Sequence, residues 1–115
     1  MIIDWTEYQK QLSGRFRDFA QLSPDTLKGY QTLSKANAQT GALGAKTREL
    51  ISIAVAVTTK CDGCITFHVD AALKAGATKE EIAETLAVAV ATNAGGALIY
   101  SARVLDAVEA HGAAK

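Results

Sequence analysis

Four side chains in the middle of the chain have the types and spacing that thiol redox chemistry needs. The protein has two cysteines, Cys61 and Cys64, and two residues separate them. His68 lies four positions after the second cysteine, and Glu49 lies twelve positions before the first. Two thiols this close can form a disulfide, and a neighbouring base and acid can move the protons that a thiolate reaction requires. We therefore predict all four as catalytic residues.

Helical geometry predicts how these side chains meet. Cys61 and Cys64 are three residues apart, so a helix places them on one side, and His68 continues the same stripe. A helix that begins just before the cysteines would hold Cys61 in its first turn, where backbone N–H groups and the helix dipole stabilise a thiolate. The preceding helix is joined to it by a tight connection, so the two should run antiparallel and place Glu49 beside His68. A proton relay would then run from the acid through the histidine to Cys64, with Cys61 as the resolving thiol.

Other interpretations of these residues are open. Cys61, Cys64 and His68 could supply three zinc ligands, with the acid or a water molecule as the fourth. Structural zinc sites usually use two separated ligand pairs, however, and the sequence has no second CxxC pair. The cysteines could also be inert and buried, and Glu49 could be an exposed acid in the first turn of its helix, where the helix dipole favours it. We favour redox chemistry and predict neither a metal nor a cofactor.

Composition places the chain among soluble single-domain proteins. Its 115 residues have an apolar content of 49%, which is enough for a single core. Twelve basic and twelve acidic side chains give a formal net charge of zero, so no charge surplus indicates a nucleic acid or an anionic membrane as partner. The segment Met1 to Glu7 carries acids where an export signal would be basic and then apolar. We therefore expect a cytoplasmic protein, and in that reducing compartment a CxxC pair is more often catalytic or metal-binding than structural.

Periodicity and capping residues predict helices along the whole chain, which we treat as a single domain of residues 1–115. Alanine, leucine, glutamate and lysine dominate the long segments, and the chain contains one proline. We therefore predict an all-α, compact, oligomeric domain of about five to six helices. The expected helices run from Trp5 to about Gln21, from Pro24 (after Ser23) to Gly41, from Lys46 to Thr58, from a break at Thr59–Lys60 to Gly76, and from Lys79 to about His111 after a Thr78–Glu81 capping box.

The last predicted helix is rich in small residues. It contains many alanines and the pair Gly95–Gly96, and each glycine costs roughly 1 kcal/mol of helix propensity relative to alanine. A gain in packing, or a kink, should offset that cost. One interpretation is a buried central helix of the monomer, and the other is a helix whose apolar surface meets a second subunit. Because the other helices leave only a thin core around it, we predict a homo-oligomer.

The sequence around the reactive residues resembles a known family. The pattern Glu-x11-Cys-x2-Cys-x3-His is preceded by KTRELI at residues 46–51 and followed by AALKAGATKEEI at residues 71–82. Together these segments resemble the AhpD-like alkylhydroperoxidase branch of the carboxymuconolactone decarboxylase family, over about residues 40–108. The resemblance implies an all-α fold that assembles into homo-oligomers, commonly trimers or hexamers. It also implies reduction of a peroxide substrate through a thiol–disulfide cycle, with electrons from a protein or lipoyl-type dithiol donor.

The resemblance also assigns roles to the reactive residues. It implies that Cys64 attacks the peroxide and that Cys61 resolves the product. It leaves His68 and Glu49 as the relay. The best-known peroxidases of this group carry histidine immediately before the second cysteine, where this chain has Gly63. The alternatives are therefore a generic disulfide reductase, a decarboxylase-type lyase and a non-enzymatic redox-sensing oligomer. The lyases act on a lactone carboxylate and need no dithiol, so the two cysteines favour redox chemistry.

Overall fold

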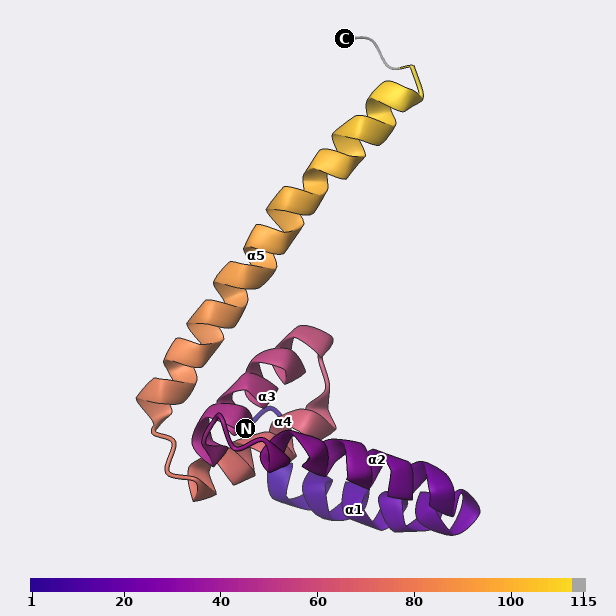
Figure 1. Cartoon of the computed structure of the whole chain (residues 1–115), viewed down its shortest axis with the longest axis vertical. Helices are drawn as coiled ribbons and strands as arrows, with labels where there is room; N and C mark the ends of the chain where they lie inside the picture. The colour runs from indigo at the N-terminus through magenta and orange to yellow at the C-terminus, as the bar shows by residue number, and fades with distance from the viewer. Residues whose placement is uncertain (113–115) are drawn as a thin grey trace.

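The computed structural model describes residues 1–112 of the chain and is built from helices (Figure 1). Its elements are α1 (Trp5–Leu22), α2 (Pro24–Ala36), the short 3-10 helix η1 (Asn37–Gln39), α3 (Ala45–Thr59), α4 (Asp62–Lys74) and α5 (Lys79–Ala110). Strands are absent from these 112 residues. The all-α prediction is confirmed, and every predicted helix is present.

Local chemistry accounts for the helix boundaries. The predicted capping box at the start of α5 is present, with both of its hydrogen bonds formed. The predicted end of the second helix is wrong, because α2 ends at Ala36 and not at Gly41. The side-chain amide of Asn37 donates to the carbonyl of Ser34 at 2.9 Å. Such a bond competes with the helical backbone pattern, and the chain continues as η1.

The core lies where α3 meets α4 and the first half of α5. The buried residues Ile53, Ala72 and Ala77 form its centre, with Leu50, Val69, Ile82 and Leu86 packed around them. Two polar contacts set the direction of α5 against α3. Lys46 pairs with Glu81 at 2.8 Å where both helices begin, and the Lys46 ammonium lowers the pKa of that carboxyl. Asn93 donates to the Thr58 hydroxyl at 2.8 Å near the end of α3, so the two helices run parallel.

Two parts of the molecule project from this core in different directions, the α1–α2 hairpin and the second half of α5 (Figure 1). The radius of gyration is 19.0 Å, whereas a compact domain of this length has about 13 Å. The predicted alternative of a buried central helix is wrong, because Ala89 is the one buried residue on α5. Within the described chain, nothing stands within 4 Å of the position that a Cβ on Gly95 or Gly96 would take. The helix also passes through this pair without a kink (Figure 1).

Candidate functional site

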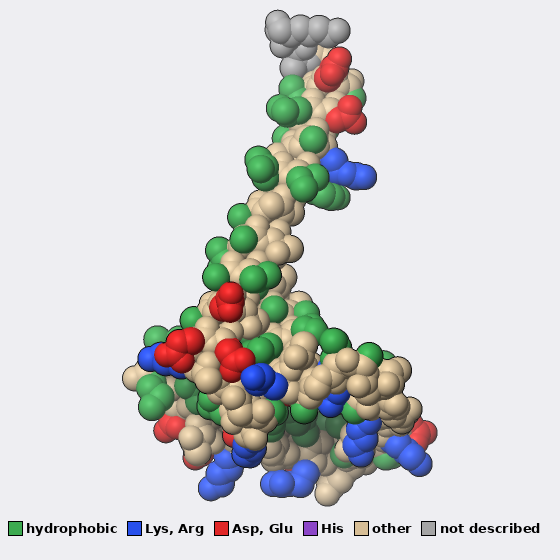
Figure 2. All heavy atoms as spheres, turned by 60° about the vertical axis from the view of Figure 1, so that its left-hand side comes forward, with side chains coloured by type: hydrophobic (Ala, Val, Ile, Leu, Met, Phe, Trp, Pro, Cys, Tyr) green, Lys and Arg blue, Asp and Glu red, His purple; other side chains and the backbone are tan. Residues whose placement is uncertain are grey.

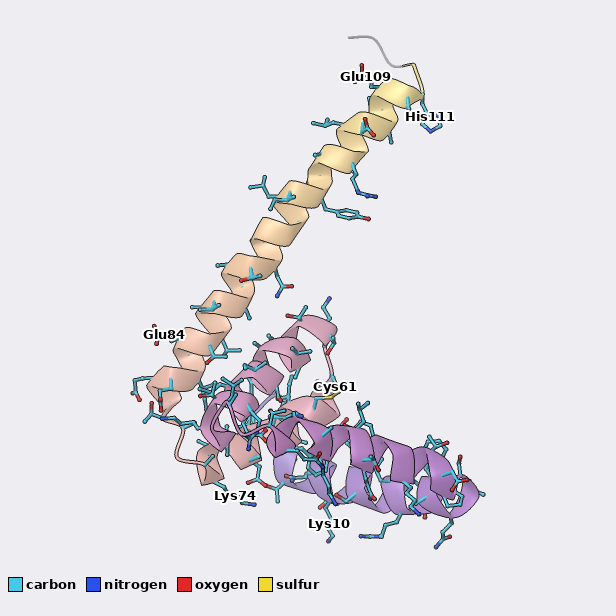
Figure 3. All side chains as sticks on the ribbon, viewed as in Figure 1. Lys10, Cys61, Lys74, Glu84, Glu109 and His111 are labelled. Atoms are coloured by element: carbon cyan, nitrogen blue, oxygen red, sulfur yellow. A yellow bond between two sulfur atoms is a disulfide. The ribbon has the colours of Figure 1, made fainter. Side chains whose placement is uncertain are left out.

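A tight chain reversal between α3 and α4 builds the site. Lys60 adopts the left-handed conformation, with φ of 56°, and ends α3. The predicted break therefore falls on Lys60, and Thr59 belongs to the helix. The backbone N–H of Cys61 then donates to the carbonyl of Ala56 at 3.1 Å. As a result α4 runs back along α3, and the two helices pack against each other. Figure 3 labels Cys61 at this reversal.

The reversal brings Glu49 on α3 against His68 on α4. The carboxylate Oε2 lies 2.7 Å from the imidazole Nδ1, which confirms the predicted adjacency. Both side chains are partly buried, with exposed fractions of 26% for Glu49 and 34% for His68. The alternative of an exposed acid in the first turn is wrong, because the first turn of α3 contains no acid. When Nδ1–H donates to the carboxylate, Nε2 is the ring nitrogen that remains to accept a proton.

The two cysteines form a disulfide, with their Cα atoms 5.2 Å apart. Cys61 is the N-cap residue of α4, so the prediction that it lies in the first turn is wrong by one position. Its Sγ accepts a hydrogen bond from the backbone N–H of Cys64 at 3.2 Å. A sulfur at this position faces the N–H groups and the positive dipole end of the helix, which stabilise a thiolate. Both cysteines are partly exposed, against the alternative of inert buried residues.

The donor set does not favour the zinc alternative. The sulfurs of Cys61 and Cys64 are bonded to each other, and zinc takes thiolates. One ring nitrogen of His68 is engaged by Glu49. In the part of the chain that the structure describes, no group of three or more histidine, cysteine, aspartate and glutamate side chains is placed to hold a metal ion.

α1 packs along α4 and shields it. The rings of Phe16 on α1 and Phe67 on α4 stack with their centroids 6.4 Å apart. The buried Thr66 hydroxyl donates to the side-chain carbonyl of Gln9 at 3.4 Å. One apolar and one polar contact therefore hold the hairpin against the helix that carries the cysteines.

The position of α1 also explains why residue 63 is glycine. A Cβ built on Gly63 would stand 2.7 Å from Cδ2 of Leu12 and 3.9 Å from the hydroxyl of Tyr8. The first distance is well inside the separation of about 3.5–4.0 Å at which carbon atoms attract each other. α1 thus occupies the space that a side chain at this position would need. A histidine between the cysteines would require Leu12 or the whole helix to shift.

An open pocket of about 600 Å³ adjoins the Glu49–His68 pair. Residues of α2, η1, the following loop and α3 line it, and His68 enters from α4. Sequence reasoning missed the other polar residues of this pocket, among them Arg48, Tyr30 and Ser34. One sequence feature pointed weakly to Arg48, which directly precedes Glu49 in the KTRELI segment. No sequence pattern indicated that α2 would line the pocket, because its position depends on how the α1–α2 hairpin packs.

A family model and a solved structure indicate the same family for this chain. Residues 24–107 match the carboxymuconolactone decarboxylase family. An uncharacterised protein of Haemophilus influenzae is 45% identical over 107 residues, which span 93% of this chain and 95% of that protein. An uncharacterised protein of Cupriavidus necator is 35% identical over 95 residues, which span 83% and 84%. The crystal structure of a carboxymuconolactone decarboxylase family protein from Legionella pneumophila has a TM-score of 0.73 at 38% identity and covers 91% of this chain and 94% of its own.

The contact between α1 and the cysteine turn can be tested with a double-mutant cycle. We expect Gly63→Ala to be less favourable in the wild-type background than in a Leu12→Ala background, by about 1 kcal/mol, the low end of the cost of overpacking. The gain in helix propensity from alanine is common to both backgrounds and cancels in the cycle. The free energy of unfolding in urea, measured for all four proteins at one concentration, gives the coupling. A coupling of zero would mean that Leu12 does not restrict position 63.

Proposed function

Because this chain belongs to the carboxymuconolactone decarboxylase family, we propose that it is an AhpD-like, thiol-dependent peroxidase that acts on alkyl hydroperoxides in the cytoplasm. The observation that carries the proposal is the 2.7 Å contact between Glu49 and His68, one helical turn beyond a CxxC disulfide. A dithiol of the protein or lipoyl type returns the enzyme to its reduced form. This reaction uses every member of the site and needs no metal or organic cofactor.

In the proposed first step the reduced enzyme cleaves the peroxide. Nε2 of His68 takes the proton of the Cys64 thiol, and Glu49 stabilises the imidazolium that forms. The Cys64 thiolate attacks the terminal oxygen of the hydroperoxide, so that an S–O bond forms and the O–O bond breaks. The alkoxide that leaves takes the proton from His68 and becomes an alcohol. The cysteine is oxidised to a sulfenic acid, and the peroxide is reduced by two electrons.

The second step closes the disulfide that the structure holds. The Cys61 thiolate attacks the sulfur of the sulfenic acid, and hydroxide leaves and takes up a proton to become water. The location of Cys61 at the N-cap of α4 supports this role, because the helix stabilises its thiolate. The same stabilisation makes Cys61 the better leaving group when the donor dithiol later attacks the sulfur of Cys64. Two exchanges with the donor regenerate both thiols and oxidise the donor to its disulfide.

A disulfide reductase that does not use peroxide is the second candidate. Gly63 favours it, because it replaces the histidine of the best-known family peroxidases, and a side chain at this position would have to displace the end of Leu12. Turnover assays separate the candidates: a peroxidase consumes many equivalents of hydroperoxide with a dithiol donor, and a reductase consumes disulfide alone. A redox sensor would react once with peroxide and stop.

We expect Cys61→Ser to trap the sulfenic acid on Cys64, because no resolving thiol remains to attack it. Treatment with alkyl hydroperoxide and a dimedone-type reagent should give a stoichiometric adduct on Cys64, which mass spectrometry detects. The matched variant Cys64→Ser should leave Cys61 unmodified at the same dose. An adduct on Cys61 in that variant, with none on Cys64 in the first, would reverse the roles of the two thiols.

Glu49 and His68 should act as one unit. We expect Glu49→Gln and His68→Ala each to lower kcat/KM for a hydroperoxide by about a hundredfold, at the low end of general acid–base contributions. The kcat/KM of the double variant should be no lower than that of the slower single variant. If the two single losses in kcat/KM instead multiply in the double variant, the two residues act independently.

The chain offers matched controls for this cycle. Glu84→Gln removes an exposed acid on α5, and His111→Ala removes the other histidine, at the far end of the same helix (Figure 3). Both should retain the wild-type rate. Thermal unfolding of all variants separates a loss of the relay from a loss of fold.

We further propose that the protein works as a homo-oligomer of the trimer or hexamer kind. Its accessible surface is 9014 Å², whereas a compact monomer of this mass exposes about 6,000 Å². The excess is comparable to the area that obligate subunit interfaces bury, about 2,000–5,000 Å². Leu98, Ile99, Val104 and Leu105 are exposed on the projecting part of α5, residues 91–110. Apolar side chains extend along this arm (Figure 2).

A second copy of the chain fits this arm better than a membrane does. By length and composition α5 is apolar enough to cross a bilayer. Its first half packs on α3, however, and Arg103 is the first charged residue of the arm. Of the uncharged stretch of residues 85–102, only residues 91–102 belong to the arm, and they span about 18 Å. That is well short of a hydrocarbon layer of about 30 Å.

Light scattering coupled to gel filtration tests the assembly. We expect the wild-type protein at micromolar concentration to have a mass three or six times the chain mass of 12.1 kDa. Leu98→Glu should lower that mass, because it places a charge in the buried contact, whereas the control Lys10→Glu on α1 should not. A wild-type monomer would refute the assembly. An unchanged mass for Leu98→Glu would show that this part of the arm lies outside the interface.

A further inference from the structure

The pocket beside the Glu49–His68 pair contains one cation, Arg48, that is not held in an ion pair within the described chain. Glu49 is engaged by His68 at 2.7 Å. The guanidinium of Arg48 donates to the backbone carbonyl of Leu43, and within residues 1–112 it forms no salt bridge. A guanidinium has five N–H donors in a planar fork, so most of its donors remain for a ligand.

Two of the other polar side chains that line the pocket also have hydroxyl groups available to a ligand. Asn37, Thr40 and Ser52 each donate to a backbone carbonyl of the same chain. Tyr30 and Ser34 also line the pocket, and their hydroxyls make no hydrogen bond in the described chain. The groups left unpaired are therefore a cation and two hydroxyls, a combination that suits an anion.

The size and the remaining walls of the pocket indicate an organic ligand. Its volume of about 600 Å³ lies within the range of small-molecule sites, about 300–1,000 Å³. Hydrogen peroxide, which is little larger than water, would leave nearly all of it empty. Leu43 and Ile51, both about half exposed, add apolar surface to the lining of the pocket.

We infer that this pocket binds organic hydroperoxides that carry a carboxylate, and that Arg48 determines this preference. The inference rests on the proposed peroxidase function. The carboxylate forms a bidentate pair with the Arg48 guanidinium, and the hydrocarbon body lies against Leu43 and Ile51. The hydroperoxide group then points to His68, which lines the pocket together with Glu49, with Cys64 one helical turn before it on α4.

A matched pair of substrates tests the inference. A medium-chain hydroperoxy fatty acid and its methyl ester differ in charge and share the reactive group. We expect the wild-type enzyme to prefer the acid. Arg48→Met should lower kcat/KM for the acid by about tenfold to a hundredfold, the value of a charge-assisted hydrogen bond, through a higher KM. The value of kcat/KM for the ester should fall much less than that for the acid.

Two further variants separate charge from structure. Arg48→Lys keeps the charge but loses the planar fork, so it should restore part of the preference for the acid. Arg15→Met removes an exposed arginine on α1 and should change neither substrate's kinetics. If Arg48→Met lowers kcat/KM equally for the acid and the ester, Arg48 only maintains the structure of the pocket, and the inference is overturned.

Failure of the inference and failure of the proposed function give different results. Turnover of the ester at a rate equal to or above that of the acid refutes the carboxylate site and leaves the peroxidase standing. If neither compound is turned over, the peroxidase proposal fails, and calorimetry with the corresponding hydroxy acid still tests the pocket. Binding to wild type that is lost in Arg48→Met would support the site, and equal binding to both would refute it.

Discussion

The left-handed backbone of Lys60, with the hydrogen bond from Cys61 to the carbonyl of Ala56, turns the chain back on itself within two residues. This reversal places α4 against α3 and determines which residues face each other across the two helices. It brings Glu49 to His68 and also places Cys61 at the N-terminus of α4. This one chain reversal therefore positions the Glu49–His68 pair and also places the sulfur of Cys61 at the positive end of the α4 dipole.

The α1–α2 hairpin adds a second constraint, which limits what the cysteine turn can contain. α1 packs against α4 through ring stacking and a hydrogen bond to a buried threonine, and Leu12 occupies the space beside Gly63. The same hairpin, through α2 and η1, forms the outer wall of the pocket next to His68. The packing of α1 beside the cysteine turn and the shape of the pocket thus have a common cause in the docking of one hairpin.

A single copy of the chain leaves many large apolar side chains exposed to water. Its buried core is confined to α3, α4, the α4–α5 connection and the first half of α5, and it contains small side chains such as Ala72 and Ala77. The remainder of α5 exposes large apolar side chains in a continuous helix. Apolar area exposed on this scale is unfavourable in water and is normally removed by association.

Helical periodicity, capping residues and one tight turn were sufficient to determine the all-α fold, the starts of α1, α2 and α5, and the contact between Glu49 and His68. These features depend on interactions between near neighbours, whose geometry a helix repeats regularly. Only the tertiary structure decided that Leu12 fills the space at Gly63, that α5 lies outside the core, and that Tyr30 joins the pocket. Each of these depends on how segments far apart in sequence dock. Periodicity shows that a helix has an apolar face, but it does not specify which surface that face will meet.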